Sequence, residues 1–188
     1  MDTTEGVHKP LGKYIFNNVN FGMLDPLIPR LREAGYKVAE NPTDPLGILV
    51  TFPVKWEGVE FTKVYKGTEY VEFNTESALE QLDRYKMIQL YYNQQNTSIT
   101  VSYSSDEIPD IIEWIRSNWD IYVGVSFLYR ADPSKTAEDL GYLYLPQEVV
   151  TKEVYDEYVS TLREIDITTG GFEELEEKDC VSGACPVK

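Results

Sequence analysis

Hydrophobic and polar residues follow one another along the chain with two periods, one typical of helices and one of strands. Apolar residues recur every three or four positions over residues 24–34, 76–92, 104–119 and 152–162, which predicts four amphipathic helices. Residues 47–54 are rich in β-forming side chains and predict a strand. Strict alternation over residues 97–103 predicts a strand with one buried face, with Ile99, Val101 and Tyr103 set against Ser98, Thr100 and Ser102.

The predicted helices carry end signals and present one apolar face each. Gly35 closes the first helix, and Pro29 inside it either kinks the helix or confines its regular part. Ser104 and Glu107 have capping-box spacing at the start of the third helix, and the fourth opens at Thr151. The expected buried residues are Leu24, Leu27, Ile28 and Leu31 in the first helix; Ala78, Leu82, Tyr85, Ile88 and Tyr92 in the second; Ile108, Ile111, Ile112, Ile115 and Trp119 in the third; and Val154, Tyr155, Tyr158 and Leu162 in the fourth.

An almost unbroken apolar run at residues 121–128 predicts a strand that is covered on both faces. With the strand at 97–103 and the helix between them, it forms a βαβ unit, normally a right-handed parallel crossover. Residues 55–73 alternate charged with aromatic or β-branched side chains, which predicts a hairpin or an exposed excursion. The predicted fold class is therefore α/β.

The composition fits one globular domain inside the cell. A chain of 188 residues with 42% hydrophobic and 13% aromatic content is able to bury a sizeable core. It contains no run of about 18 apolar residues that would span a membrane, and its first residues lack the pattern of a secretory signal. A net charge of −15 disfavours binding to nucleic-acid phosphates. We therefore expect a cytoplasmic protein that binds neither membranes nor nucleic acids.

Both cysteines of the chain lie in its last ten residues, D-C-V-S-G-A-C-P-V-K. Four residues separate Cys180 from Cys185, and Gly183 lets this short loop turn so that the two sulfurs can meet. A glycine pair and an acidic run at residues 170–179 precede them. A thiol pair on such an arm suits thiol–disulfide exchange. The competing interpretation is an incidental tail, and a structural disulfide closing so short a loop would stabilise the fold little.

Other chemistry has little support in the sequence. The phosphate-binding patterns G-x-G-x-x-G and G-x-x-x-x-G-K-[ST] do not occur. His8 is the only histidine, so a histidine-rich metal site is excluded, zinc is poorly supported and no metal site is predicted. We expect His8 to be structural rather than catalytic.

Several short motifs occur in the order in which one enzyme family has them. They are G-V-H-K-P (6–10), L-R-E-A-G-Y (31–36), V-T-F-P-V-K (50–55), N-T-S-I-T-V-S (96–102), V-G-V-S-F-L (123–128), L-P-Q-E-V-V-T (145–151) and the terminal C-x-x-x-x-C-P-V-K. Together they resemble the C-terminal quarter of a class II, adenosylcobalamin-dependent ribonucleotide reductase of the monomeric ribonucleoside-triphosphate type. The resemblance covers nearly the whole chain.

The resemblance implies a fold and a division of labour. Residues 1–166 would be the C-terminal part of a ten-stranded α/β barrel completed by a partner chain, and residues 167–188 a flexible acidic redox tail. Cys180 and Cys185 match the family's terminal shuttle pair, which re-reduces the active-site disulfide and is itself reduced by a thioredoxin-like protein. The thiyl cysteine and the active-site dithiol have no counterpart here, so a larger chain would carry them and would bind most of the adenosylcobalamin.

The implied function is that of a small subunit or C-terminal fragment that supports the reduction of ribonucleotides to deoxyribonucleotides and is not catalytically complete alone. A natural split gene, an intein- or intron-derived piece and a piece truncated for expression all fit; the initiating methionine favours a natural split. Residues 3–6, T-T-E-G, depart from the family, where a proline precedes the glycine, so no substrate role is assigned to them. The rival hypothesis is a stand-alone acidic binding or regulatory module with no redox role, which occupies a basic surface of its partner.

Overall fold

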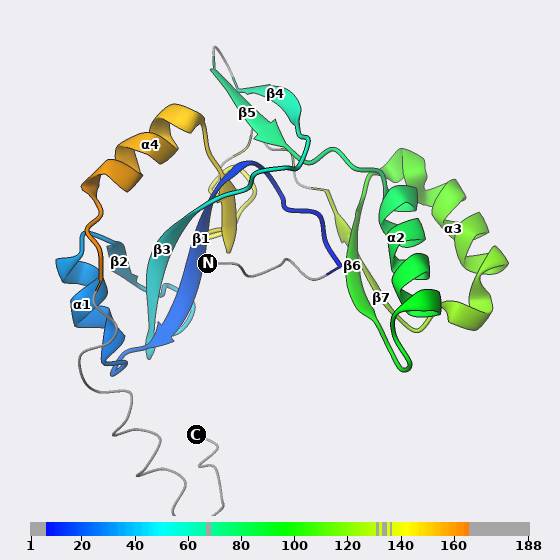
Figure 1. Ribbon diagram of the computed structural model, residues 1–188, viewed down its shortest axis with the longest axis horizontal. Coiled ribbons are helices and arrows are strands. Elements are labelled where there is room, and N and C mark those ends of the chain that lie inside the picture. Colours follow the sequence, from blue (N-terminus) through cyan, green and yellow to red (C-terminus); the bar gives the residue numbers. More distant parts are fainter. Residues whose placement is uncertain (1–6, 67–68, 131, 133–134, 136, 166–188) are drawn as a thin grey trace, which may run out of the picture.

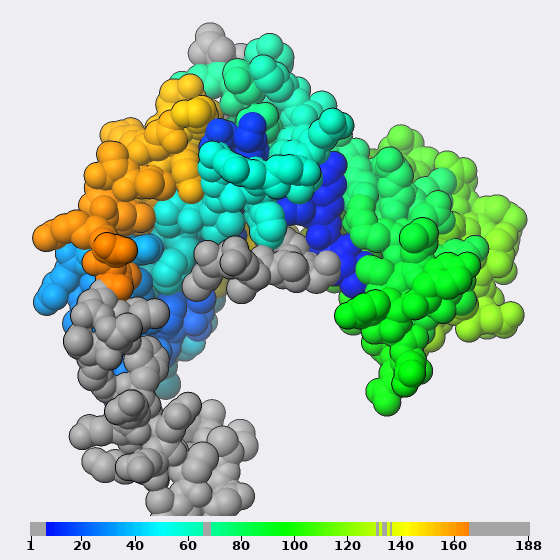
Figure 2. All heavy atoms as spheres, in the orientation of Figure 1, coloured from blue at the N-terminus to red at the C-terminus, as the bar shows by residue number. Residues whose placement is uncertain are grey.

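The computed structural model of the protein describes residues 7–66, 69–130, 132, 135 and 137–165. These residues form two lobes of sheet and helix that are joined beneath a β-hairpin, so that the molecule has the outline of an arch (Figures 1 and 2). Each lobe has its own hydrophobic core. Residues 8–11 and residues 137–149, far apart in the sequence, meet at the junction between the lobes.

The first lobe is an antiparallel sheet with strand order β2-β3-β1-β8. Its strands are β1 (Tyr14–Gly22), β2 (Lys37–Glu40), β3 (Gly47–Lys55) and β8 (Gln147–Val149). Helix α1 (Leu27–Glu33) packs Ile28 and Leu31 against Ile48 and Val50 of β3. Helix α4 (Lys152–Thr161) docks through Tyr158, whose hydroxyl donates to the carbonyl of Thr51 at 2.8 Å.

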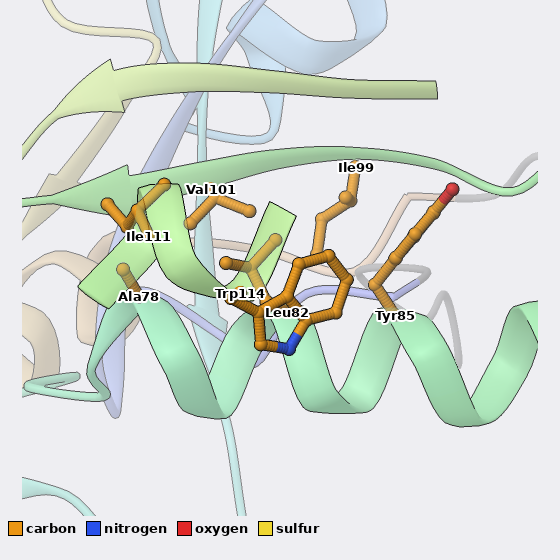
Figure 3. Packing of buried hydrophobic residues seen from close by; sticks show 7 residues of the cluster. All are labelled: Ala78, Leu82, Tyr85, Ile99, Val101, Ile111 and Trp114. Carbon is orange, nitrogen blue, oxygen red and sulfur yellow. The ribbon is translucent and has the colours of Figure 1, made fainter. Parts of the chain in front are cut away.

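The second lobe is a βαβ unit covered by helices on one face. Strands β6 (Ser98–Tyr103) and β7 (Gly124–Tyr129) are parallel, and η1 (Ser105–Glu107), α3 (Ile108–Ser117) and η2 (Trp119–Ile121) connect them. Helix α2 (Ala78–Tyr91) precedes β6 in the chain. The core, drawn in Figure 3, consists of residues from α2, β6 and α3: Ala78, Leu82, Tyr85, Ile99, Val101, Ile111 and Trp114.

The hairpin β4 (Thr62–Lys66) and β5 (Glu69–Phe73) lies above the junction of the lobes (Figure 1). It is tied to the residues before β1 in two ways. Gly12 forms an isolated bridge with Phe73, and the ammonium of Lys13 pairs with the carboxylate of Glu72 at 3.2 Å. The hairpin predicted within residues 55–73 is therefore confirmed.

The four predicted helices and the parallel crossover are also confirmed, but part of the predicted burial is wrong. Leu24, Tyr92 and Val154, which were expected to be buried, are 93%, 85% and 42% exposed, and the buried face of α3 also differs from the prediction. Ile111 is buried as expected, whereas Ile108, Ile112 and Trp119 are 41%, 44% and 68% exposed. The helix is turned so that Trp114 enters the core, where its indole N–H donates to Asp83 of α2 at 2.8 Å. A large ring with a polar partner on the neighbouring helix therefore outweighs the isoleucine stripe.

Residues 121–128 do not form a strand covered on both faces. The strand begins only at Gly124, after η2, and Ser126 and Leu128 are exposed. Helices α2 and α3 cover one face of the β6–β7 pair; no described element covers the other. The second face is the basis of the candidate site.

Candidate functional site

The uncovered face of β6 and β7 is lined by small polar side chains. Because strand residues alternate, burying Ile99 and Val101 beneath the helices turns Ser98, Thr100 and Ser102 to the other side. On β7 the same side carries Ser126 and Leu128, and the hydroxyls of Thr100 and Ser126 lie 2.9 Å apart. Parallel sheets are usually covered on both faces. A polar, uncovered face is therefore a place for a ligand or for another part of an assembly.

Two adjoining cavities lie at the carboxyl ends of these strands, between the lobes. One has a volume of about 260 Å³ and is lined from the second lobe by Ser102, Leu128 and Arg130, and from the rest of the chain by Leu11, Phe73, Leu140, Leu145, Gln147 and Val149, among others. The second, of about 250 Å³, shares Phe73, Ser102 and Arg130 and adds His8, Lys9, Asn74, Glu76 and Thr100. In α/β sheets ligands bind at the carboxyl ends of parallel strands.

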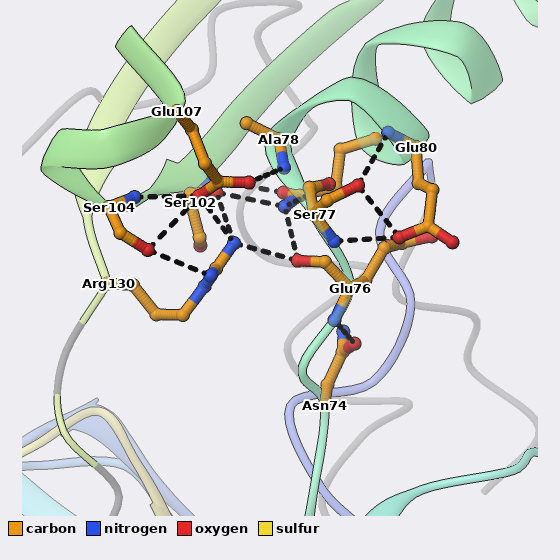
Figure 4. Close-up of polar contacts among 10 residues, drawn as sticks. Asn74, Glu76, Ser77, Ala78, Glu80, Ser102, Ser104, Glu107 and Arg130 are labelled. Atoms are coloured by element: carbon orange, nitrogen blue, oxygen red, sulfur yellow. Dashed lines mark hydrogen bonds and ion pairs between the residues drawn. The ribbon is translucent and has the colours of Figure 1, made fainter.

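Arg130 closes this end of the sheet (Figure 4). It follows β7 directly, and its side chain is only 22% exposed. Its guanidinium donates to the carbonyls of Glu76 and Ser102 at 2.8 and 3.1 Å, and to the hydroxyl of Ser104 at 3.1 Å. One cation thereby joins the ends of β6 and β7 to the segment before α2.

The counter-charge of Arg130 is Glu107, whose carboxylate lies 3.2 Å from the guanidinium. The same carboxylate accepts hydrogen bonds from the backbone N–H of Ala78 at 2.7 Å and of Ser104 at 2.8 Å. Burial on its own would raise the pKa of Glu107, but the hydrogen bonds from these two N–H groups and the charge of Arg130 outweigh burial and hold it below its ordinary value. Glu107 is therefore ionised at neutral pH.

A second pair of charges lies beside the first. The carboxylate of Glu76 is 10% exposed and pairs through one oxygen with Arg84, while its other oxygen is buried without a hydrogen-bond partner among the described residues. Burial lowers the pKa of the Arg84 guanidinium. Nearby, the buried side-chain amide of Gln81 bonds to both the carbonyl and the N–H of Ser102, at 3.0 and 2.9 Å, which fixes α2 against the end of β6.

The structure tests the predicted site residues only in part. Cys180 and Cys185 lie outside the described residues. His8 is exposed and lines the second cavity. Within the described ranges, no group of three or more His, Cys, Asp or Glu side chains could hold a metal ion. Nor does any described helix combine the length and the apolar content that crossing a bilayer requires.

The network around Arg130 was not predicted as a site. Its one visible signal was the capping-box spacing of Ser104 and Glu107, which both residues do form. Arg130 follows a strand at its carboxyl end, a position that favours a functional role, but its partners come from three other segments. These partners come close to Arg130 only because the crossover returns β7 beside β6, and no local motif predicts this.

The chain was compared with known protein families, protein sequences and solved structures. No protein-family model matches the chain. It is 26% identical over 194 residues to the adenosylcobalamin-dependent ribonucleoside-triphosphate reductase of Lactobacillus gasseri, a match that covers 98% of this chain and 24% of the relative. A probable reductase of the same name from Dictyostelium discoideum is 24% identical over 188 residues, with 98% and 23% covered.

A crystal structure of a B12-dependent (class II) ribonucleotide reductase superposes with a TM-score of 0.60 at 22% identity, over 93% of this chain and 22% of that one. The chain thus spans about a quarter of the length of the relatives it matches, and the superposition supports the mixed α/β fold. The resemblance noted in the sequence is confirmed: nearly the entire chain is similar to adenosylcobalamin-dependent ribonucleoside-triphosphate reductases.

Proposed function

We propose that the chain is the C-terminal portion of an adenosylcobalamin-dependent ribonucleotide reductase and works with a larger chain that carries the rest of the enzyme. The observation that carries this proposal is the similarity to such reductases along 98% of the chain. The rest of each relative, about three quarters of its length, has no counterpart here, so the radical chemistry belongs to other residues than these.

In this proposal residues 1–166 complete a barrel. The β6–β7 pair supports it, because a parallel pair with helices outside and a hydroxyl-lined face inside is what a segment of an α/β barrel wall presents. Among the described residues β6 and β7 pair only with each other, which leaves an edge of each available to strands of the larger chain.

The ribonucleotide would lie on the uncovered face, near the carboxyl ends of the strands. The cofactor fits the region around Arg130 poorly, since each of the two cavities there is smaller than the roughly 300–1,000 Å³ of ordinary small-molecule sites, and a corrin ring is larger still. We therefore assign adenosylcobalamin mainly to the larger chain and derive no step of this chain's chemistry from it.

The proposed chemistry of this chain is electron delivery by residues 167–188. A thiolate of the Cys180–Cys185 pair attacks the oxidised active-site disulfide and forms a mixed disulfide, and the second thiol of the pair resolves it. Two electrons and two protons pass to the active-site cysteines, which leave as a dithiol, while Cys180 and Cys185 become a disulfide. A thioredoxin-like dithiol reverses the change on the tail by the same exchange.

The test is co-expression with the larger chain, followed by ribonucleotide reduction in the presence of adenosylcobalamin. With thioredoxin as donor, replacing Cys180 and Cys185 by Ser should stop multiple turnovers and leave the single turnover of a pre-reduced active site intact. Dithiothreitol, which can enter the site without the tail, should partly restore cycling. Wild-type cycling of the double variant with thioredoxin would refute the shuttle.

The same preparation distinguishes the rival function. An acidic binding module would fold alone, bind a basic partner and be indifferent to the loss of both thiols. A complex that forms, reduces ribonucleotides and needs both cysteines would exclude that alternative.

A further inference from the structure

We propose that Glu107 is a positioning residue for the cavity between the lobes: it fixes Arg130, and through Arg130 it holds the carboxyl ends of β6 and β7 in the arrangement that a ligand requires. The kinetic arm of the test below rests on the proposed function, whereas the structural arm does not. A simple helix cap is the rival role for Glu107, and the two roles predict different outcomes.

The two oxygens of Glu107 divide their partners between elements. Oε1 accepts the N–H of Ala78 at the start of α2, at 2.7 Å. Oε2 accepts the N–H of Ser104 at 2.8 Å and its hydroxyl at 3.1 Å, and it also faces Arg130 at 3.2 Å. One carboxylate thus joins α2, the end of β6 and the end of β7, which are the three elements that meet at the cavity (Figure 4).

The ion pair of Arg130 and Glu107 is largely shielded from solvent, so loss of the Glu107 charge should affect Arg130. The side chains of Arg130 and Glu107 are 22% and 16% exposed. Removing the negative charge leaves a half-buried guanidinium uncompensated, which favours its movement toward water. Glu76, the neighbouring carboxylate, already pairs with Arg84. Movement of Arg130 would release the carbonyl of Ser102 and change the wall that both cavities share.

Glu80 provides a matched control within the same lobe. It forms the same capping box at the start of α2, and its carboxylate accepts the N–H and the hydroxyl of Ser77, both at 2.8 Å. Within the described part of the chain, its hydrogen bonds go to Ser77. The substitution Glu80→Gln therefore removes an equivalent capping charge and leaves Arg130 in place.

The structural arm compares hydrogen exchange in the full-length chain, alone and with the larger chain. We expect Glu107→Gln to speed exchange about tenfold at the amides of residues 101–104 and 127–130, because a charge-assisted contact is lost there. Glu80→Gln should leave these amides within about twofold of wild type. Unchanged exchange in Glu107→Gln, or equal changes in both variants, would overturn the proposal whether or not the chain proves to be a reductase.

The kinetic arm is a double-mutant cycle with Arg130→Lys, which keeps the charge but not the fork of donors. With dithiothreitol as reductant, Glu107→Gln should lower kcat/KM for the ribonucleotide about tenfold, mainly through KM. In the Arg130→Lys background the same change should have little further effect, because Glu107 acts through Arg130. Additive losses in the cycle would assign Glu107 to capping alone and refute its positioning role. An inactive wild-type complex would instead count against the proposed function, and the exchange experiment would still decide the role of Glu107.

Discussion

Tyr85 illustrates how a single buried polar atom fixes the geometry of a crossover. Its side chain is 0% exposed, and its ring lies against Trp114 with the centroids 6.5 Å apart. Its hydroxyl donates to the carbonyl of Ile121 at 2.8 Å and accepts the N–H of Val123 at 3.1 Å. This hydroxyl therefore satisfies two backbone groups at the point where η2 turns into β7.

The substitution Tyr85→Phe should lower the free energy of unfolding by about 1–3 kcal/mol, because it leaves both backbone groups without this partner and opens no large cavity. Denaturant titration of the chain without the larger chain measures the change. Tyr91→Phe is the control, since Tyr91 lies on the same helix and is 83% exposed. Equal losses in the two variants would show that the buried hydrogen bonds of Tyr85 contribute nothing specific.

The lowered pKa of Glu107 predicts a pH dependence with a definite sign. A carboxyl group with a lower pKa in the folded chain than in the unfolded chain stabilises the fold at any pH above its ordinary pKa of 4.5. This stabilisation is lost as the pH falls from 4.5 through the lower pKa of the folded chain. At pH 7, Glu107→Gln should cost about 1.5–3 kcal/mol, as expected for a hydrogen bond to a charged group. Unfolding measured from pH 7 down to pH 3 should show the wild type and the variant converging. A constant difference over this range would contradict the assignment.

At the scale of elements, the two helices of the first lobe meet at Gly35. The residue has a φ of 92°, and a Cβ at this position would lie 2.7 Å from the carbonyl oxygen of Thr161. Close by, the N–H of Arg163 donates to the carbonyl of Ala34 at 2.8 Å. The end of α1 therefore rests directly on the backbone at the end of α4.

Gly35→Ala should destabilise the chain by more than about 2 kcal/mol, since it combines a left-handed backbone with a steric clash. Gly58→Ala is the matched control: Gly58 has a φ of 73°, but nothing lies within 4 Å of its hypothetical Cβ. It should cost only the backbone term of about 1 kcal/mol. Equal effects of the two substitutions on the thermal midpoint would mean that the α1–α4 contact is not tight.

At this scale, the elements whose limits the sequence predicts best lie next to one another in the second lobe. Helix α2, strand β6 and helix α3 follow one another in the second lobe, and the sequence predicts α2 and β6 within two residues of their observed limits. Strand β1 was not predicted, because three asparagines interrupt its apolar pattern. The side chain of Asn18 bonds to the carbonyl of Leu145 and to the hydroxyl of Thr51, partners that no local motif reveals.

The candidate site divides in the same way. The polar face of β6 follows from its alternation, and the capping box of Glu107 follows from its spacing. The ion pair with Arg130 bridges 23 positions in sequence numbering, from residue 107 to residue 130, and it exists only because the crossover returns β7 beside β6. A contact that depends on the tertiary structure in this way cannot be predicted from local sequence patterns.

At the scale of the molecule, the described residues expose surfaces of the kind found at protein interfaces. Besides the hydroxyl-lined face, the second lobe exposes large apolar side chains at the end remote from the cavity, namely Met87, Leu90, Tyr91, Tyr92, Trp119 and Val123. Exposed aromatic side chains in such numbers are uncommon on monomers and typical of protein interfaces. The larger chain of the proposed reductase is the partner that would cover them.

We therefore expect the isolated chain to be marginally stable and the larger chain to stabilise it. Adding the larger chain should raise the thermal midpoint and slow hydrogen exchange along β6 and β7, whose outer edges would then be paired. A cooperative unfolding transition of the monomeric chain that the larger chain leaves unchanged would contradict both this expectation and the completed barrel.

The pairing of β1 with β8 has a consequence for how the protein is made. Ile15, Phe16 and Asn17 lie opposite Val149, Glu148 and Gln147, so one edge of the first sheet waits for a strand synthesised near the other end of the chain. At about 5–20 residues per second, a ribosome needs roughly 6–25 s to travel from the end of β1 to β8. The second lobe, by contrast, is contiguous in sequence and has all its parts before β8 emerges. During that interval the edge of β1 that later pairs with β8 stays unpaired, while the second lobe is already complete. We expect chaperones to bind at this edge first, and pairing with other nascent chains to begin there.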